Sequence, residues 1–198
     1  MDSNDVRREW ADRSGEHSPA YYAHRGPDEA SELLVSTLSD RVGHDASVLE
    51  LGCSSGRHLA ALADAGFTDL TGIDVNADAL RVLAETYADL AATGSFHVAA
   101  IEEFLPKLDD DAFDVVFTVE TLQHIHPDEA RVFDEIARVA GELLVVVENE
   151  TEEPGTTTEV HEGIPLFYRD WQDVFTGRGC RELAATAMKR DTMRVFEP

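Results

Sequence analysis

A run of small residues follows a short apolar segment near residue 50. Val48-Leu49-Glu50-Leu51 leads into Gly52-Cys53-Ser54-Ser55-Gly56, and the chain continues with Arg57. Small side chains let a ligand approach the backbone closely, and the start of a following helix offers unpaired N–H groups. The spacing therefore predicts a strand, a tight turn and a helix that together bind a ligand.

Asp74 ends the next apolar run, about 20 residues after Gly52. An acidic residue at this distance accepts hydrogen bonds from the diol of a ribose. Ser54 and Arg57 occupy two of the three glycine positions of the dinucleotide pattern G-x-G-x-x-G, and the turn has no lysine of the P-loop type. We therefore expect a nucleoside-containing cofactor that is not a dinucleotide, at the carboxyl ends of the first two strands.

These motifs belong to a chain in which strand and helix patterns alternate. Apolar runs predict strands at Ser47–Leu51, Leu70–Asp74, Phe96–Ala100, Ala112–Thr118 and Leu143–Glu148. Helical spacing predicts helices over His58–Ala65, from the N-cap Asn76 through Leu83, Tyr87 and Leu90, and from Pro127 through Val132, Ile136 and Val139. Such alternation, with nearly continuous apolar strands, is typical of a parallel sheet covered on both faces.

The two ends of the chain differ from this alternating part. The first 45 or so residues have a helical pattern, with a helix opening at Gly26-Pro27. After Glu150 a polar stretch predicts a loop, followed by a helix near Tyr168–Thr176. Arg181–Lys189 and Met193–Phe196 then predict a terminal antiparallel hairpin, so the expected sheet is mixed.

The charge balance excludes several classes of partner. The chain has 40 acidic and 16 basic residues and a net charge of −24, and its basic residues are 14 Arg and 2 Lys. We expect no direct nucleic-acid ligand and no membrane surface, because both need a basic footprint. The acidic residues are spread along the chain, which favours a halophilic protein whose self-repulsion is screened by salt.

The remaining composition favours a cytoplasmic protein. Cys53 and Cys180 form no disulfide framework, which is typical of reduced thiols in a cytosol. The first residues include no apolar stretch of the kind found in a signal peptide. The longest aliphatic run, Leu143–Val147, has the length of a strand and is far too short for a membrane span.

Three segments together resemble the successive motifs of class I S-adenosylmethionine-dependent methyltransferases. They read VLELGCSSGRHL, LTGIDVN and FDVVFTVETLQHIHPDEA, and the resemblance covers roughly residues 45–150. It implies an α/β, doubly wound, Rossmann-like fold: a seven-stranded, mostly parallel sheet with a C-terminal antiparallel hairpin. The length of 198 residues is that of a single domain. Within residues 1–198 we expect a helical N-terminal lid (1–45), a cofactor-binding core (46–150), and a loop, helix and hairpin (151–198).

The resemblance implies S-adenosyl-L-methionine as cofactor and S-adenosyl-L-homocysteine as product. Residues carried over as cofactor contacts are Glu50, Gly52 and Gly56 for the methionyl part, Asp74 for the ribose, Ile101 and Glu102 for the adenine, and Thr118 at the methionyl end. Cys53, Ser54 and Val75, which adjoin these residues, are further expected contacts. Ser54 departs from the family pattern, which has a glycine there. The segment Leu122-Gln123-His124 also departs from the frequent Leu-His-His.

The segment after the fourth predicted strand is expected to border the methyl acceptor. Glu120 and His124 are the candidate catalytic residues, and they would share one helix face if this segment were helical. His126, Glu148 and His161 are further candidates for a general base. A metal held by Glu120, His124 and His126 is disfavoured, so no metal site is predicted. His124 also has a simpler interpretation as a structural histidine.

The aromatic residues near the N-terminus have two interpretations. Trp10, Tyr21 and Tyr22 are either core residues or part of a lid over the cofactor, and Tyr22 and Arg25 are then the expected contacts. The threonine run at residues 156–158 is interpreted as a mobile loop near the site.

A small-molecule acceptor is the first hypothesis for the substrate, because the segments outside the core leave room for a lid and not for a recognition domain. A protein side chain is the second hypothesis. A hypothesis of another class is a non-catalytic S-adenosylmethionine-binding subunit that activates or stabilises a partner enzyme.

Overall fold

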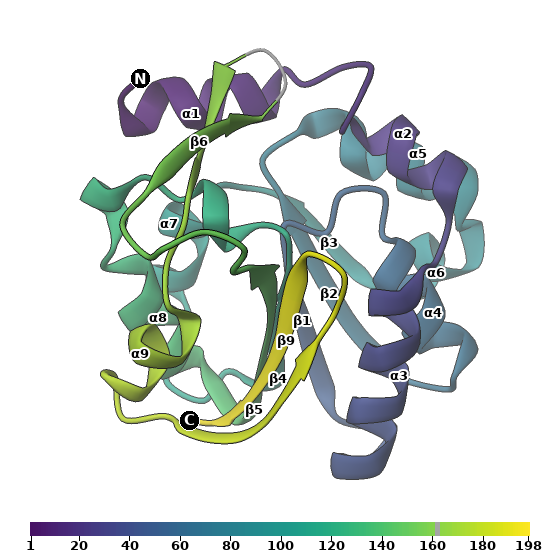
Figure 1. The fold of residues 1–198 in the computed structure, drawn as a ribbon. Helices are drawn as coiled ribbons and strands as arrows, with labels where there is room; N and C mark the ends of the chain where they lie inside the picture. Colours follow the sequence, from purple (N-terminus) through teal and green to yellow (C-terminus); the bar gives the residue numbers. More distant parts are fainter. Residues whose placement is uncertain (161–162) are drawn as a thin grey trace. The chain divides into compact units, whose positions relative to one another are not determined.

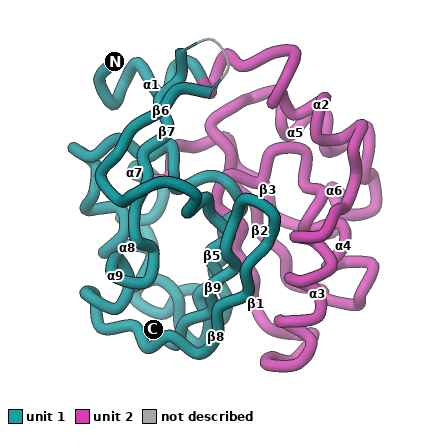
Figure 2. The backbone as a smooth tube through the Cα atoms, viewed as in Figure 1, with its two compact units in different colours: residues 1–9, 102–198 teal, residues 10–101 magenta. Residues whose placement is uncertain are grey.

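The computed structural model describes residues 1–160 and 163–198. The backbone divides into two units, which are residues 10–101 and residues 1–9 with 102–198 (Figure 2). Seven strands belong to one sheet, in the order β3-β2-β1-β4-β5-β9-β8, and β6 and β7 pair separately. The predicted fold class, a mostly parallel seven-stranded sheet ending in an antiparallel pair, is confirmed.

The unit of residues 10–101 carries three parallel strands (Figure 1). They are β1 (Ser47–Leu51), β2 (Asp69–Asp74) and β3 (Ser95–Val98). Its helices are α2 (Pro19–Arg25), α3 (Glu29–Arg41), α4 (Arg57–Asp64), α5 (Ala77–Thr86) and α6 (Ala88–Thr93). Leu51 pairs with Ile73, so the turn after β1 and the end of β2 lie side by side.

The other unit contains β4 (Phe113–Val119), β5 (Ala140–Asn149), β6 (Thr157–Val160), β7 (Ile164–Phe167), β8 (Arg181–Ala187) and β9 (Asp191–Glu197). Its helices are most of α1 (Ser3–Ala11) and of α7 (Ile101–Phe104), then α8 (Val132–Val139) and α9 (Trp171–Thr176). Three 3-10 turns are η1 (Leu105–Lys107), η2 (Leu122–His124) and η3 (Pro127–Glu129). β4 and β5 are parallel, and β5–β9 and β9–β8 are antiparallel.

Burial follows the predicted apolar pattern in both units. Ala30, Leu34 and Leu38 of α3 are buried on one face, and burying a leucine side chain contributes about 2 kcal/mol. β5 is buried continuously over residues 143–149, as expected for a strand covered on both faces. No helix of the described residues is long and apolar enough to cross a membrane.

The helix predicted from Asn76 to Leu90 is divided in two. Asn76 caps α5 as predicted, with Oδ1 accepting from the N–H of Asp78 at 2.9 Å. The backbone leaves the helical region at Tyr87 (φ −127°, ψ 62°), and α6 begins at the next residue. This bend lets Leu83 and Leu90 both border Gly56.

Three predicted element boundaries differ from the observed ones. The third strand ends at Val98 and not at Ala100, since its partner strand ends at Asp74. Pro127 opens a 3-10 turn, and α8 begins only at Val132. The first strand of the terminal hairpin ends at Ala187, after which the N–H of Met188 donates to the carbonyl of Asp191.

The polar stretch after Glu150 is not simply a loop. Its described residues include the antiparallel pair β6–β7, in which Thr157 faces Phe167 and Val160 faces Ile164. β-Branched and aromatic residues stabilise such cross-strand pairs. Most of the threonine run at 156–158 is therefore in a strand, whereas His161 lies outside the described residues.

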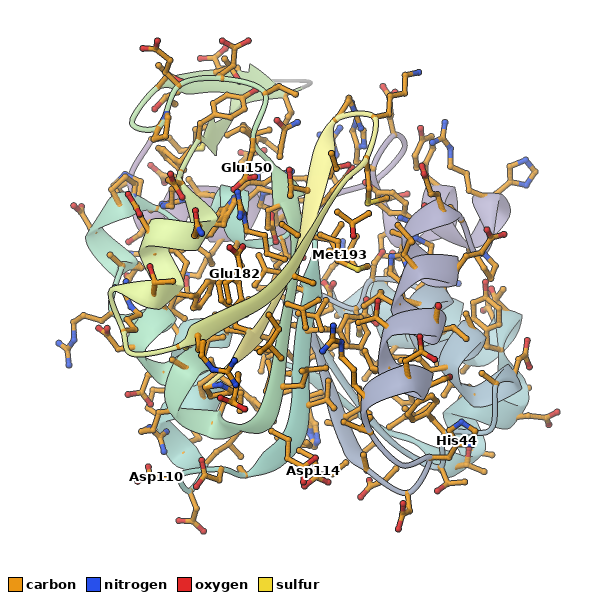
Figure 3. All side chains as sticks on the ribbon, turned by 60° about the horizontal axis from the view of Figure 1, so that its bottom comes forward. His44, Asp110, Asp114, Glu150, Glu182 and Met193 are labelled. Atoms are coloured by element: carbon orange, nitrogen blue, oxygen red, sulfur yellow. The ribbon has the colours of Figure 1, made fainter. Side chains whose placement is uncertain are left out.

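A charge network attaches the terminal hairpin to α9. Both oxygens of Glu150 accept from the guanidinium of Arg194, at 2.9 and 3.0 Å, and Glu182 accepts from the same guanidinium at 2.6 Å. Glu150 also accepts from the N–H of Trp171, the first residue of α9, at 3.2 Å. Glu150 and Glu182 are labelled in Figure 3.

Candidate functional site

The turn between β1 and α4 is formed by residues in the left-handed region. Gly52 (φ 74°), Ser54 (φ 48°) and Gly56 (φ 77°) all have positive φ. A Cβ on Gly56 would lie 2.5 Å from Cδ1 of Leu83, so a side chain here would be strained at φ 77° and would displace Leu83. Ser54 adopts this conformation with a side chain present, at a cost of about 1–2 kcal/mol.

Asp74 fixes this turn from the neighbouring strand. Its Oδ2 accepts from the N–H of Ser54 and its Oδ1 from the N–H of Asn76, both at 2.8 Å. Burial raises the pKa of the Asp74 carboxyl, and these two N–H groups lower that pKa in part. An ionised carboxylate offers about four acceptor positions, so about two remain for a ligand.

Glu50 and Ser55 leave hydrogen-bonding capacity unused beside Asp74. The side chain of Glu50 is 1% exposed, yet its Oε2 has no hydrogen-bond partner among the described residues, and neither has Oγ of Ser55. Burial raises the pKa of Glu50 well above its usual range, Arg57 lowers it, and Asp74 raises it further. Buried polar atoms without partners cost free energy, so this arrangement fits a bound group that supplies them.

The structure brings most of the predicted cofactor residues together in one unit. Glu50, the turn from Gly52 to Gly56, Asp74 and the half-buried Val75 are neighbours at the ends of β1 and β2, and Cys53 is buried beneath the turn. Tyr22 lies against the turn's helix, with the Arg57 guanidinium 4.9 Å from its ring centre. Arg25 is placed over Tyr21 instead, at 4.7 Å.

The predicted adenine neighbours begin α7. Ile101 is buried and Glu102 is half-buried. Burial raises the pKa of Glu102, Arg7 of α1 lowers it, and Glu129 and Glu103 raise it.

A buried carboxylate organises the segment after β4. Glu148 of β5 accepts from the hydroxyl of Thr118 (2.8 Å) and from the N–H groups of Thr121 (3.0 Å), Leu122 (2.8 Å) and Gln123 (3.2 Å). Burial raises the pKa of Glu148 to about 7 against the lowering effect of these donors. The hydroxyl of Thr118, a predicted cofactor contact, is therefore engaged with Glu148.

Arg169 holds the other end of the same turn. Its guanidinium donates to the carbonyls of Leu122 at 3.2 Å and Ile125 at 2.5 Å, and it lies over the rings of Phe133 and Trp171. Burial lowers the pKa of Arg169 to about 10, and Glu148 raises it. An anion at the N–H end and a cation at the carbonyl end thus hold residues 121–125.

This turn orients the imidazole of His124. Gln123 Oε1 accepts from the N–H of Asn149 at 3.1 Å, which directs its amide nitrogen toward His124 Nε2 at 3.5 Å. His124 Nδ1 lies 3.3 Å from the carbonyl of Pro165, a pure acceptor, so Nδ1 carries the proton and the Nε2 lone pair faces the Gln123 amide. The helical spacing considered for Glu120 and His124 is not formed, since η2 is a 3-10 turn.

Glu120 and His126 have separate neighbours. Glu120 has φ 48° and pairs with Arg190 of the β8–β9 turn at 3.4 Å. His126 is extended before Pro127; its Nδ1 accepts from the N–H of Asp128, and its ring meets Phe167 edge-on. Among the described residues there is no group of three or more potential metal ligands.

Sequence reasoning missed Arg169, Arg190 and the second role of Asn76. No local signal marks the two arginines, because their partners come from distant parts of the chain. The position of Asn76, two residues after Asp74, could have indicated a role near the cofactor, but only its role as a helix cap was predicted.

Residues 48–142, just under half of the chain, match the family model described as a methyltransferase domain. The fold is similar to that of magnesium protoporphyrin IX methyltransferase (ChlM) from Synechocystis PCC 6803 with bound S-adenosylhomocysteine. The TM-score is 0.70 at 14% identity, over 99% of this chain and 98% of that chain. These findings support the class I S-adenosylmethionine-dependent methyltransferase family. They also support S-adenosylmethionine as the cofactor of this methyltransferase domain.

Two curated relatives carry methyltransferase names. The O-antigen chain terminator bifunctional methyltransferase/kinase WbdD of Escherichia coli is 34% identical over 56% of this chain, and the match spans only 15% of its own length. The O-methyltransferase cnsE of Penicillium expansum is 25% identical over 89% of this chain and 70% of its own length. The non-catalytic alternative is not favoured by these relatives.

Proposed function

We propose that this protein transfers a methyl group from S-adenosylmethionine to a small-molecule acceptor with a weakly acidic hydroxyl. The observation that carries the proposal is the unsatisfied Glu50 carboxylate beside Asp74, at a turn that admits close approach to its backbone. When bound, the cofactor supplies a sulfonium methyl group whose carbon is already activated by positive charge.

The cofactor half of the chain binds and orients. Asp74 offers its remaining acceptor positions to the ribose diol, and Glu50 offers Oε2 to the cationic amino group of the methionyl part. Tyr22, Arg25, Val75, Ile101, Glu102 and Thr118 stay proposed neighbours of the cofactor. Because the leaving group is activated, positioning and the exclusion of water are the main tasks of the protein.

His124 is the proposed general base. Its Nε2 would exchange the Gln123 amide for the acceptor hydroxyl and take up the proton that this hydroxyl loses, while the cofactor would supply the methyl group. The relative named an O-methyltransferase supports a hydroxyl acceptor. Glu120, paired with Arg190, is the proposed second polar contact of the acceptor.

Two measurements test this proposal. Calorimetry in molar KCl is expected to show binding of S-adenosylhomocysteine and no binding of NAD. Transfer of a labelled methyl group is then followed over a panel of phenols, alcohols and amines. Absence of S-adenosylhomocysteine binding would overturn the proposed function.

The acceptor side has its own prediction. His124→Ala is expected to lower methyl transfer about 100-fold, the size of a lost general base, and to leave the Kd for S-adenosylhomocysteine unchanged. Glu120→Gln should lower transfer less. His126→Ala is the matched control, because this histidine lies two positions beyond η2 and its ring packs edge-on against Phe167. Equal rates for all three variants and the wild type would make the segment structural.

A further inference from the structure

Asn76 connects the cofactor half to the N-terminal segment. The side chain is 5% exposed, and all of its polar groups are engaged. Its backbone N–H donates to Asp74 Oδ1 and its Oδ1 accepts from Asp78, while Nδ2 donates to the carbonyls of Trp10 (3.2 Å) and Arg13 (3.0 Å). One residue therefore orients the proposed ribose acid and holds a segment more than sixty positions away.

The held segment has a defined shape of its own. Arg13 is buried and its Nε donates to the carbonyl of Glu16 at 2.8 Å, and the hydroxyl of Ser18 donates to Gly15 at 2.7 Å. Ser18 then caps α2 by accepting from the N–H of Tyr21. Residues 10–25 therefore form a turn and a short helix, which we call the N-terminal strap.

The strap has a second attachment beside the glycine turn. Arg57, the residue after Gly56, lies over the ring of Tyr22 and forms an ion pair with Asp28, which follows the strap. The two attachments, Asn76 and Arg57, therefore each stand within two residues of a cofactor motif, Asp74 and Gly56. Both attachments therefore join the strap to residues that flank the proposed cofactor contacts.

We propose that Asn76 is a positioning residue that couples cofactor binding to the N-terminal strap, so that cofactor release requires loss of the two amide hydrogen bonds. The inference rests on the proposed function. A bound ribose fixes Asp74, Asp74 fixes the backbone of Asn76, and the Asn76 amide then holds the carbonyls of Trp10 and Arg13. The cofactor and the strap are therefore expected to stabilise each other, because coupling between two sites is reciprocal.

The test replaces Asn76 with serine. Serine caps a helix as well as asparagine does, but its side chain has no amide and is too short to reach the two carbonyls. We expect S-adenosylhomocysteine to dissociate about tenfold faster from Asn76→Ser, the effect of losing two hydrogen bonds of modest net strength, with little change in the association rate. Asp170→Ser, which exchanges the cap of α9, is the matched control and should dissociate at the wild-type rate.

The chain supplies a spectroscopic reporter for the strap. It has two tryptophans, and Nε1 of Trp171 has no hydrogen-bond partner among the described residues. Trp171→Phe therefore removes no side-chain hydrogen bond of the described structure. In that background Trp10 emission should change on S-adenosylhomocysteine binding, and the change should be smaller in Asn76→Ser. A merely structural Asn76 would lower the melting temperature and leave the dissociation rate and the Trp10 response unaltered.

Hydrogen exchange of the wild type gives a second test that does not depend on a variant. S-adenosylhomocysteine should slow exchange of the backbone N–H groups in residues 10–18. Failure of the wild type to bind the ligand overturns the proposed function. Binding without protection of residues 10–18, or wild-type dissociation from a folded Asn76→Ser, overturns the coupling alone.

Discussion

Two buried glutamates, one in each unit, differ in how their carboxylates are satisfied. Glu50 of β1 is 1% exposed and Glu148 of β5 is 0% exposed, and burial raises the pKa of both. Glu148 accepts four hydrogen bonds, whereas Oε2 of Glu50 accepts none from the described residues. A saturated buried carboxylate acts as an anchor for the backbone around it, and an unsatisfied one is suited to a ligand.

The largest expected difference between the two glutamates is in stability. Glu148→Ala leaves four donors without an acceptor and should lower the free energy of unfolding by about 3–5 kcal/mol. Glu50→Ala removes the same atoms but leaves no described donor unpaired, and should cost only about 1–2 kcal/mol, the cost of the cavity. Chemical denaturation in molar KCl measures both values. Equal losses of unfolding free energy in the two variants would show that the two glutamates do not differ in their structural role.

Cofactor affinity is expected to depend on Asp74 and on the neighbouring Glu50. Asp74→Ala should weaken binding of S-adenosylhomocysteine by about 1.5–3 kcal/mol, because it removes hydrogen bonds to a charged group. Glu50→Gln, which keeps the volume but removes the charge, should weaken it less. Asp74→Asn keeps one acceptor for the turn, so it separates the loss of the ribose contact from loosening of Ser54. Calorimetry gives each Kd, and an unchanged Kd for Asp74→Ala would place the ribose elsewhere.

The pH dependence of stability sharpens the comparison. The folded-state pKa of Glu148, about 7, lies above the ordinary value of 4.5, so the folded protein holds this proton more tightly than the unfolded chain. The corresponding stability is complete below about pH 4.5 and is lost as the pH rises through about 7, which amounts to about 2 kcal/mol between about pH 5 and pH 7.

Melting temperatures over this range separate the two contributions. In Glu148→Ala the melting temperature should fall less steeply with rising pH, because the contribution of Glu148 is removed. Bound S-adenosylhomocysteine should reduce the contribution of Glu50 to the same pH dependence, since burial also raises the pKa of Glu50. If the ligand leaves the pH dependence of the melting temperature unaltered, Glu50 is not its contact.

The smallest expected difference between the Glu50 and Glu148 variants is in how their stability depends on salt. The net charge of −24 predicts a melting temperature that rises between low and molar KCl, because salt screens repulsion among surface carboxylates. Buried Glu50 and Glu148 are screened little, so the losses in their variants should stay nearly constant over this range. A flat melting temperature of the wild type would remove the halophilic interpretation.

Much of the fold was predictable from local pattern. The strands Ser47–Leu51 and Leu143–Glu148 lie within β1 and β5, and the cap at Asn76 is confirmed. The glycine turn and Asp74 were predictable as neighbours because parallel strands bring their carboxyl ends to one edge. Errors gathered at strand ends, as at Val98, and in the pair β6–β7, where the partner decides the outcome.

The sequence by itself determined where the cofactor motifs lie, since a turn of small residues and an acid after the next strand are properties of neighbouring positions. Tertiary structure decided what each polar side chain does. Glu148 looked like one more candidate base, until the donors of residues 118 to 123 were brought around it. Asn76 looked like a helix cap, until its amide reached Trp10 and Arg13. The physical reason is that a buried polar group is defined by the partners that satisfy it, and those partners are distant in sequence.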